Sequence, residues 1–447
     1  MRTGKPAVER DPGRGRRSGR WCSRLDRGRR SGRGPGALRL IVLLGSALLL
    51  ASCATRYQKP DPFDDTALRA RVKTVAEDGI QVSAVIPNRA EIEAIFGADL
   101  TKKNIQPLWL EIRNDTDRQI FFLPTGLDPE YFSPLEVAFG FHKPYSKEGR
   151  AEFDRYIEST GMQLRIDPHT TESGFIFTNP DQDSKLVNVD LFGLKWTKSI
   201  ALVVPTPDRD VPDSYYERLV RTREGLVFED VQDEARLREL LEQLPCCVTA
   251  RDGSRGEPLN LVMVGSLTDI GSSLIRRSYR VAPAAPWYLF GRVQDVSLNK
   301  QDTWVAAQPH TVRAWLTDIR FQGKTVWIGS VTMPLGGRFA GGSGNDAGPR
   351  LDPNIDEARN DLVQDMIYSQ HLGRLGFARG VGRVTTSKPR ATQGGGTYHT
   401  DGLRAVLLFE HDPVSISEIG NLGWERLVDH YRTQIDRGDG APPGKTP

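Results

Sequence analysis

The chain has few of the residues that build metal and redox sites. Its 447 residues include four Cys and seven His. Neither a Cys-x-x-Cys pair nor a His-Glu-x-x-His motif occurs, so the spacings typical of zinc sites are missing. The glycine-rich stretch 336–348 lacks Gly-Lys-Ser/Thr, which argues against a phosphate-binding loop. No Gly-x-Ser-x-Gly is present either. We therefore expect no metal and no cofactor.

Long hydrophobic runs are also missing. The uncharged stretch 40–54 has 15 residues, short of the ~20 that a transmembrane helix needs. It follows a basic segment, because residues 1–39 hold 12 Arg and one Lys against three acidic residues, a charge of +10. Since the whole chain carries +3, residues 40–447 carry −7. A basic segment, a short apolar run and small residues after it are typical of a secretory signal peptide.

The end of the apolar run, Leu50-Ala51-Ser52-Cys53, resembles the lipobox of bacterial lipoproteins. The resemblance implies cleavage before Cys53 and attachment of diacylglycerol and palmitate to it, which would anchor the protein firmly. It places the protein in the cell envelope, on the cell membrane or outer membrane, exposed to the periplasm or the exterior. Ala54 in place of an aspartate favours the outer membrane.

The Arg-rich segment has a second interpretation, binding of nucleic acid or anionic lipid. Cleavage before Cys53 would remove this segment. We therefore expect membrane lipid as a partner, together with an envelope protein, and no nucleic acid for the mature chain.

Periodicity and composition divide the chain into six segments. We expect a signal region in 1–52, a lipidated tether in 53–66, a β-rich domain in 67–207, a helical connector in 211–244, a second domain in 245–412, and a helix (424–435) with a disordered tail in 413–447.

The predicted fold class is mixed. Short alternating strands separated by turns, with a helical insertion, predict an N-terminal β-sandwich, Ig-like or similar. Tight hairpins are expected at Glu77-Asp78-Gly79 and at Gln322-Gly323. The order strand–helix–strand–strand–helix–strand in 245–412 predicts an α+β domain with helices packed on one face of a sheet. Cys246 and Cys247, as neighbours, are expected to be reduced and buried.

Five blocks within residues 255–410 resemble the LssY C-terminal domain family. They are Tyr288-Leu-Phe-Gly-Arg292-Val-Gln-Asp295, His310-Thr-Val-Arg313-Ala-Trp315, Gly323-Lys-Thr-Val-Trp327-Ile-Gly329, Asp352-Pro-Asn-Ile-Asp356-Glu-Ala-Arg359 and Thr400-Asp401-Gly402. The family has no established activity. Its members often accompany membrane-embedded lipid-phosphatase-like segments, which are missing from this sequence.

The chain departs from the family pattern at three places. Gly348-Pro349-Arg350 replaces a Thr-His-His triplet, Ala358 replaces a glutamate, and Pro309 replaces a second histidine beside His310. If the family has a His/Glu site, most of its ligands are missing from this chain.

A helix expected over residues 355–367 carries two charged residues on its apolar side. Asp356 and Arg359 lie three residues apart within the apolar stripe, and Asp352 is the expected N-cap. Buried charges need partners. The stripe consists of Ile355, Leu362, Val363, Met366 and Ile367, and the opposite side of Glu357, Asp361, Gln364 and Asp365.

Two interpretations of Asp356 and Arg359 remain open. They line a polar pocket, or they belong to a structural ion-pair network with Asp295, Arg292 or Arg313. His310 shares a strand face with Val312, whereas Arg313 and Trp315 point to the other face.

The function favoured by the sequence is a lipid-anchored envelope protein that serves as a non-catalytic binding or assembly module. The alternative is an envelope hydrolase acting on a phosphate- or lipid-containing substrate. Its candidate catalytic residues are His310, Asp356, Arg359 and Asp295, and its candidate ligand-binding residues are Arg292, Arg313 and Asp401. A cleft that gathers these residues would favour the enzyme. Burial and mutual pairing would favour the module.

Overall fold

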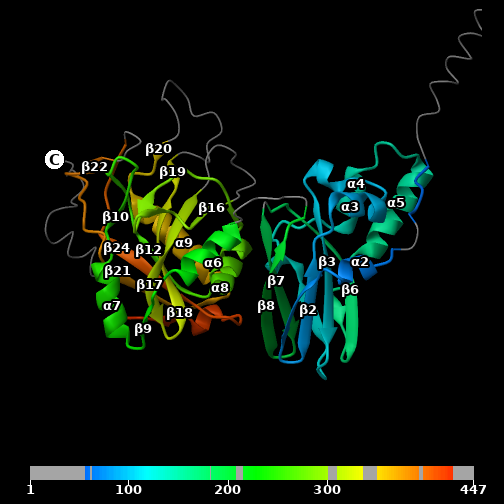
Figure 1. Ribbon diagram of the computed structural model, residues 1–447, viewed down its shortest axis with the longest axis horizontal. Helices are drawn as coiled ribbons and strands as arrows, with labels where there is room; N and C mark the ends of the chain where they lie inside the picture. Colours follow the sequence, from blue (N-terminus) through cyan, green and yellow to red (C-terminus); the bar gives the residue numbers. More distant parts are fainter. Residues whose placement is uncertain are drawn as a thin grey trace, which may run out of the picture. The chain divides into compact units, whose positions relative to one another are not determined.

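The N-terminal lobe (residues 63–207) contains two antiparallel four-stranded sheets (Figure 1). The computed structural model describes residues 56–60, 63–181, 183–207, 215–300, 310–335, 350–391 and 396–425. One sheet has the order β1 (Lys73–Glu77), β2 (Ile80–Val85), β3 (Gln106–Asn114), β6 (Thr170–Thr178). The other has the order β5 (Arg165–Ile166), β4 (Ile120–Leu123), β7 (Ser184–Gly193), β8 (Trp196–Pro205).

The two sheets share one hydrophobic cluster, as the facing sheets of a sandwich do. Val82 and Leu110 of the first sheet and Val189 and Ile200 of the second belong to it, and all are fully buried. The mixed fold class is confirmed, and the Ig-like detail stays a prediction. The hairpin at residues 77–79 is also confirmed, since Asp78 and Gly79 both have positive φ between β1 and β2.

A layer of helices covers the other face of the first sheet (Figure 1). It comprises α3 (Arg89–Phe96), α4 (Pro134–Gly140) and α5 (Lys147–Thr160). The short helices α2 (Thr66–Arg69) and η1 (Leu100–Lys103) contribute to the same hydrophobic cluster as these helices, and η2 (Pro124–Gly126) follows β4. Because side chains alternate along a strand, Trp109 points toward the helices while Leu108 and Leu110 point to the shared cluster.

Tyr57 docks the start of the described chain onto this helical layer. Its ring is 2% exposed, packs edge-on against Phe153 at 4.8 Å and Tyr145 at 5.4 Å, and its hydroxyl donates to the carbonyl of Phe96. The predicted tether is therefore fixed at Tyr57, because an aromatic side chain in that stretch finds a buried partner.

The C-terminal lobe (residues 215–425) is built on a large sheet. Its strand order is β13 (Tyr279–Val281), β16 (Val296–Lys300), β17 (Thr311–Phe321), β18 (Lys324–Thr332), β12 (Leu261–Gly265), β24 (Leu403–Phe409), β21 (Leu372–Arg379), β25 (Gly420–Asn421), and β9 (Glu229–Val231) also pairs with β17. The pairs β12–β24, β21–β25 and β9–β17 are parallel, and the other pairs are antiparallel.

Helices cover both faces of this sheet (Figure 1). On one face, α8 (Leu267–Arg276) and α9 (Ile355–Ile367) pack against Leu261 and Met263. On the other face, α7 (Glu234–Gln243) packs against Val262 and Val264. The prediction of helices on one face was therefore incomplete, because α7 lies in the segment expected to be a connector. That segment also holds α6 (Tyr215–Glu224) and the strand β9.

Smaller elements complete the lobe. They are the sheet β11 (Arg255–Pro258), β10 (Cys247–Thr249), β14 (Tyr288–Leu289), β15 (Arg292–Val293), the pairs β19 (Pro334–Leu335) with β20 (Arg350–Leu351) and β22 (Arg390–Ala391) with β23 (Thr397–Tyr398), and the helix η3 (Ile416–Glu418). Within the described ranges, no helix is long and apolar enough to span a membrane.

Several local predictions can be compared with the structure. Gln322 and Gly323, both with positive φ, join β17 to β18 as predicted. Asp352 is not the N-cap of α9. That position is Asn354, whose backbone N–H donates to Asp352. Cys246 and Cys247 are both free, but only Cys247 is buried. Trp424 and Glu425 lie in a bend, and residues 426–435 of the expected helix fall outside the described residues.

Arg404 on β24 ties four segments of the lobe together. Its side chain is fully buried and donates to the carbonyls of Leu241, Leu244 and Pro245 at the end of α7, to Leu259 and to Gly380. Burial lowers its pKa to about 10, so it stays protonated at neutral pH. A cation at a helix C-terminus is favourable because the carbonyl ends carry partial negative charge.

Replacing Arg404 tests this role. Arg404→Met should lower the free energy of unfolding by about 3–5 kcal/mol, because buried carbonyls lose their donors. Urea unfolding followed by circular dichroism measures the loss. Arg379→Met, at a 68% exposed side chain, is the control and should change the free energy by less than about 1 kcal/mol. Equal effects of the two changes would contradict the role of Arg404.

Candidate functional site

Asp356, Arg359 and Asp401 form one buried ion-pair network. The Arg359 guanidinium pairs with both carboxylate oxygens of Asp401, at 2.8 and 2.9 Å, and lies 3.4 Å from Asp356. Arg359 is fully buried, and the two aspartates are 4% and 3% exposed. Burial raises the pKa of Asp356 despite the nearby Arg359.

The local sequence explains the placement of this network. Asp356 and Arg359 face the same way because they lie three residues apart on α9. The turn before β24 lies opposite these two residues and directs hydrogen-bond donors toward the helix. Thr400 Oγ1 and the backbone N–H of Asp401 donate to the two oxygens of Asp356 at 2.7 Å each. Arg359 also donates to the carbonyl of Leu403 at 3.0 Å. The network therefore fastens α9 to the start of β24.

His310 lies elsewhere, on another side of α9. Its Nδ1 atom is 3.1 Å from a carboxylate oxygen of Asp361, and Lys300 Nζ is 3.5 Å from the same carboxylate. The close contact with His310, together with Lys300, lowers the pKa of Asp361 to about 2 although burial opposes this. Since Asp361 follows Arg359 by two residues, about 200° around the helix, His310 and Arg359 face different surroundings.

Asp365 corrects one detail of the sequence prediction. It was expected on the polar side of the helix, but it is 5% exposed. Lys300 Nζ lies 2.6 Å from its carboxylate, Tyr279 donates to it at 3.0 Å, and Arg277 pairs with it at 3.1 Å. The strands β13 and β16 and the end of α8 thus supply the partners that hold this carboxylate under the protein surface.

The remaining candidates form two further pairs. Arg292 pairs with Asp295 at 3.0 Å, and Asp295 accepts a hydrogen bond from the backbone N–H of Leu316 at 2.8 Å. Arg313 pairs with Glu257 at 2.8 Å, and burial raises the pKa of that carboxyl. The network of Asp356 and Arg359 therefore differs from the predicted one, because Asp295 pairs with Arg292 and Arg313 pairs with Glu257. Asp356 and Arg359 instead bind Asp401 and Thr400.

The seven candidates therefore separate into four groups. Each carboxylate among them has a cationic or hydrogen-bonding partner of its own. Within the described ranges, no group of three or more His, Cys, Asp or Glu residues is arranged to hold a metal ion. This geometry matches the structural interpretation more closely than a shared catalytic cleft.

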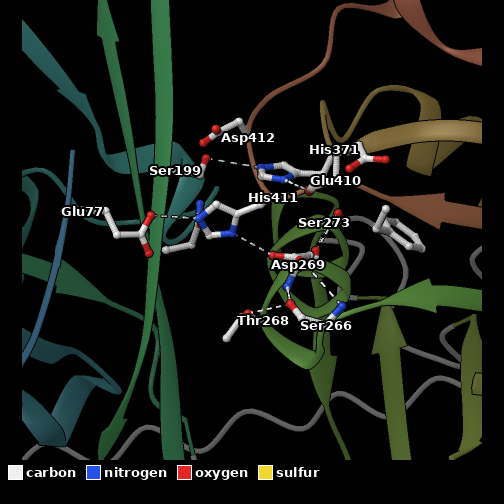
Figure 2. Close-up of polar contacts among 12 residues, drawn as sticks. Glu77, Ser199, Ser266, Thr268, Asp269, Ser273, His371, Glu410, His411 and Asp412 are labelled. Carbon is white, nitrogen blue, oxygen red and sulfur yellow. Dashed lines mark hydrogen bonds and ion pairs between the residues drawn. The ribbon is translucent and has the colours of Figure 1, made fainter. Parts of the chain in front are cut away.

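A second polar cluster joins the two lobes and was not foreseen from the sequence (Figure 2). His411, just after β24, lies between Asp269 on α8, at 3.0 Å, and Glu77 on β1, at 3.2 Å. Lys198 on β8 contacts Glu77 at 3.2 Å and Asp412 at 3.4 Å. The carboxylates outweigh the effect of burial and raise the pKa of Lys198 to about 12.

A Ser–His contact lies beside this cluster (Figure 2). Ser199 Oγ is 3.3 Å from His371 Nε2, but the hydroxyl donates to Asp190 at 2.5 Å. Asp190 also pairs with Arg276 of α8. Ser199 and His371 are each 1% exposed. A substrate could not reach the Ser199 hydroxyl in this position, so the contact is structural and does not resemble an accessible nucleophile.

The comparisons with known proteins address the C-terminal lobe. Residues 266–403 match the family model described as LssY C-terminus. The predicted resemblance is confirmed over these residues, which make up less than a third of the chain. No curated protein matches the chain. The LssY-like match includes Asp269, Asp356, Arg359 and Asp401, and it ends before His411.

The buried Arg359 network can be tested by removing its cation. Arg359→Met should lower the free energy of unfolding by about 3–5 kcal/mol, because two buried carboxylates lose their partner. Urea unfolding measures the loss. Arg236→Met, at a surface pair with Glu229 and Glu239, should cost less than about 1 kcal/mol. A stable Arg359→Met protein would contradict the structural role.

The contact of His411 with both lobes should make stability depend on pH. Burial opposes the charged form, but Asp269 and Glu77 outweigh it and raise the pKa of His411 in the folded state. The stabilisation is therefore complete below the ordinary His pKa of about 6.5 and is lost as the pH rises through the raised value.

The measurement is the urea midpoint of the wild type and of His411→Gln over a range of pH. The wild-type advantage should shrink as the pH rises. His169→Gln, at a surface pair with Asp117, serves as the control, and its difference from the wild type should be small. A His411→Gln difference that stays constant with pH would refute the linkage.

Proposed function

We propose that the protein is a bacterial lipoprotein, anchored in the cell envelope through lipidated Cys53, and that its lobes form a non-catalytic binding or assembly module. The non-catalytic role is supported by the burial and pairing of the candidate catalytic residues. Asp356, Arg359 and Asp401 are buried and mutually paired. Groups arranged in this way stabilise a fold, whereas catalytic groups need access to a substrate.

The docking of Tyr57 supports a close attachment to the membrane. Cys53 precedes Tyr57 by four residues, and an extended chain spans at most about 3.5 Å per residue. Tyr57 would therefore lie within about 14 Å of the lipidated residue. The lobe that receives Tyr57 would be held near the lipid surface.

The charge of the mature chain supports the choice of partners. Cleavage before Cys53 removes the basic segment and leaves −7, since residues 40–52 carry no charge. An acidic protein of this kind has no electrostatic surplus for nucleic acid. Lipid would provide the attachment, and a partner or ligand in the envelope would be recognised by the lobes.

The alternative hydrolase receives no comparable support. It would need His310 near Asp356, Arg359 or Asp295, whereas His310 pairs with Asp361. Asp295 instead accepts hydrogen bonds from Arg292 and Leu316.

Replacement of Cys53 tests the anchor. Cys53→Ser should abolish metabolic labelling with a palmitate analogue and leave the longer precursor, because the thiol that carries the lipid is gone. Gel mobility and labelling measure both effects. Cys22→Ser is the matched control and should be processed and labelled normally. Normal processing and labelling of Cys53→Ser would overturn the assignment.

A further inference from the structure

A cavity of about 110 Å³ lies where α8 and the large sheet meet the strands β7 and β8. Its lining is almost entirely apolar. It is formed by Met263, Trp327, Val296 and Leu298 of the sheet, by Ile270 and Leu274 of α8, and by Leu186 and Val203 of the N-terminal lobe. Leu186 and Val203 are only partly buried, so the two lobes do not close over their side chains.

The walls of the cavity are held in place by close packing and ion pairs. A Cβ atom on Gly271 of α8 would lie 2.6 Å from Leu186 Cδ2, so helix and strand touch directly at this glycine. Arg276 pairs with Asp190, and Arg280 pairs with the fully buried Asp128. Collapse of the cavity would have to disturb these contacts, which explains why it persists.

The mouth of the cavity is polar. Asp181, Ser184, Arg280 and Val281 line both the apolar cavity and a neighbouring polar hollow. That hollow also carries Asp183 and Glu130, so its lining contains three carboxylates and one guanidinium. Arg280 pairs with Asp128 and Asp181 pairs with Lys185, so the further carboxylates of the hollow, Asp183 and Glu130, give it an excess of negative charge. The mouth therefore favours a neutral or cationic polar group over an anionic one.

We propose that this cavity binds the short aliphatic chain of an amphiphile whose polar end, neutral or cationic, lies at the Asp181–Arg280 mouth. An apolar cavity of ~150 Å³ stays free of water and accepts benzene, so the volume of this cavity suits a chain of about six carbons or fewer. The apolar walls of the cavity favour an aliphatic group over water. The polar residues at its mouth favour a ligand that also has a polar end over a pure hydrocarbon. The proposal deepens the binding role proposed above and does not depend on the lipid at Cys53.

Trp327 provides a reporter inside the cavity. The full chain in phosphatidylcholine nanodiscs is titrated with 6-bromohexanol, 6-bromohexyltrimethylammonium or 6-bromohexanoate, whose bromine quenches tryptophan. We expect saturable quenching that is lost in Trp327→Phe, and affinity for the neutral and cationic probes about tenfold higher than for the anionic one. Discs made with brominated phosphatidylcholine form a separate arm, in which we expect no quenching of Trp327, because the chains of a membrane lipid are too long for the cavity.

Val203→Phe fills the cavity and should weaken probe binding at least about tenfold. Val75→Phe makes the same change at a partly buried valine of β1 that does not line the cavity, and it should bind within about twofold of the wild type. Circular dichroism and urea unfolding check that both variants fold. If Val203→Phe does not fold, loss of the saturable quenching in Trp327→Phe alone decides.

Two results would overturn the proposal. One is quenching that persists unchanged in Trp327→Phe, which would place the probe elsewhere. The other is preferred binding of the anionic probe, which would refute the assignment of the mouth. Failure of Cys53→Ser to block lipidation would overturn the anchor and leave this binding assay untouched, so the two proposals fail separately.

Discussion

The C-terminal lobe depends on the requirement that a buried guanidinium satisfy its hydrogen bonds inside the protein. Arg359 and Arg404 are both fully buried, and each meets the requirement differently. Arg359 binds the carboxylate of Asp401, which fastens α9 to the sheet. Arg404 binds backbone carbonyls at the end of α7, which fastens the opposite helix to the same strand. Together they fix α9 and α7 on opposite faces of the sheet. The sheet held in this way also carries α8 and His411, which contact the N-terminal lobe.

The sequence predicted those features that depend on neighbours along the chain. The hairpins at Asp78-Gly79 and Gln322-Gly323 need only local turn geometry, and the inward direction of Asp356 and Arg359 follows from helical periodicity. Their partners could not be predicted, because Asp401 is supplied by a turn about 40 residues later in the chain. Arg404 gave no signal either, since its partners are backbone carbonyls, which leave no trace in residue identity. The residues that join the lobes, such as His411 and Glu77, are ordinary charged residues until the fold brings them together.

The described structure also separates two kinds of polar group that look alike in sequence. Paired carboxylates such as Asp356 and Asp365 are held by several donors and serve as fasteners. The acidic residues around Asp181 line a hollow instead. Burial distinguishes the two kinds, since Asp356 and Asp365 are buried whereas Asp181 is partly exposed. The apolar cavity beside Asp181 makes that region the better place to seek a ligand. The match to the LssY C-terminus includes most of the sheet and α8 but none of β7 or β8, so the cavity combines surfaces inside and outside the matched region.

The docking of Tyr57 has a mechanical consequence. Because its ring is wedged among Phe153 and Tyr145, tension applied to the chain before residue 57 would be transmitted to the helical layer of the N-terminal lobe. The β strands behind that layer would bear the load next, through the contacts of Trp109 and its neighbours. The C-terminal lobe would bear this load only where it is itself held by a partner, and the force would then pass through the contacts of Glu77 and Lys198 with His411 and Asp412.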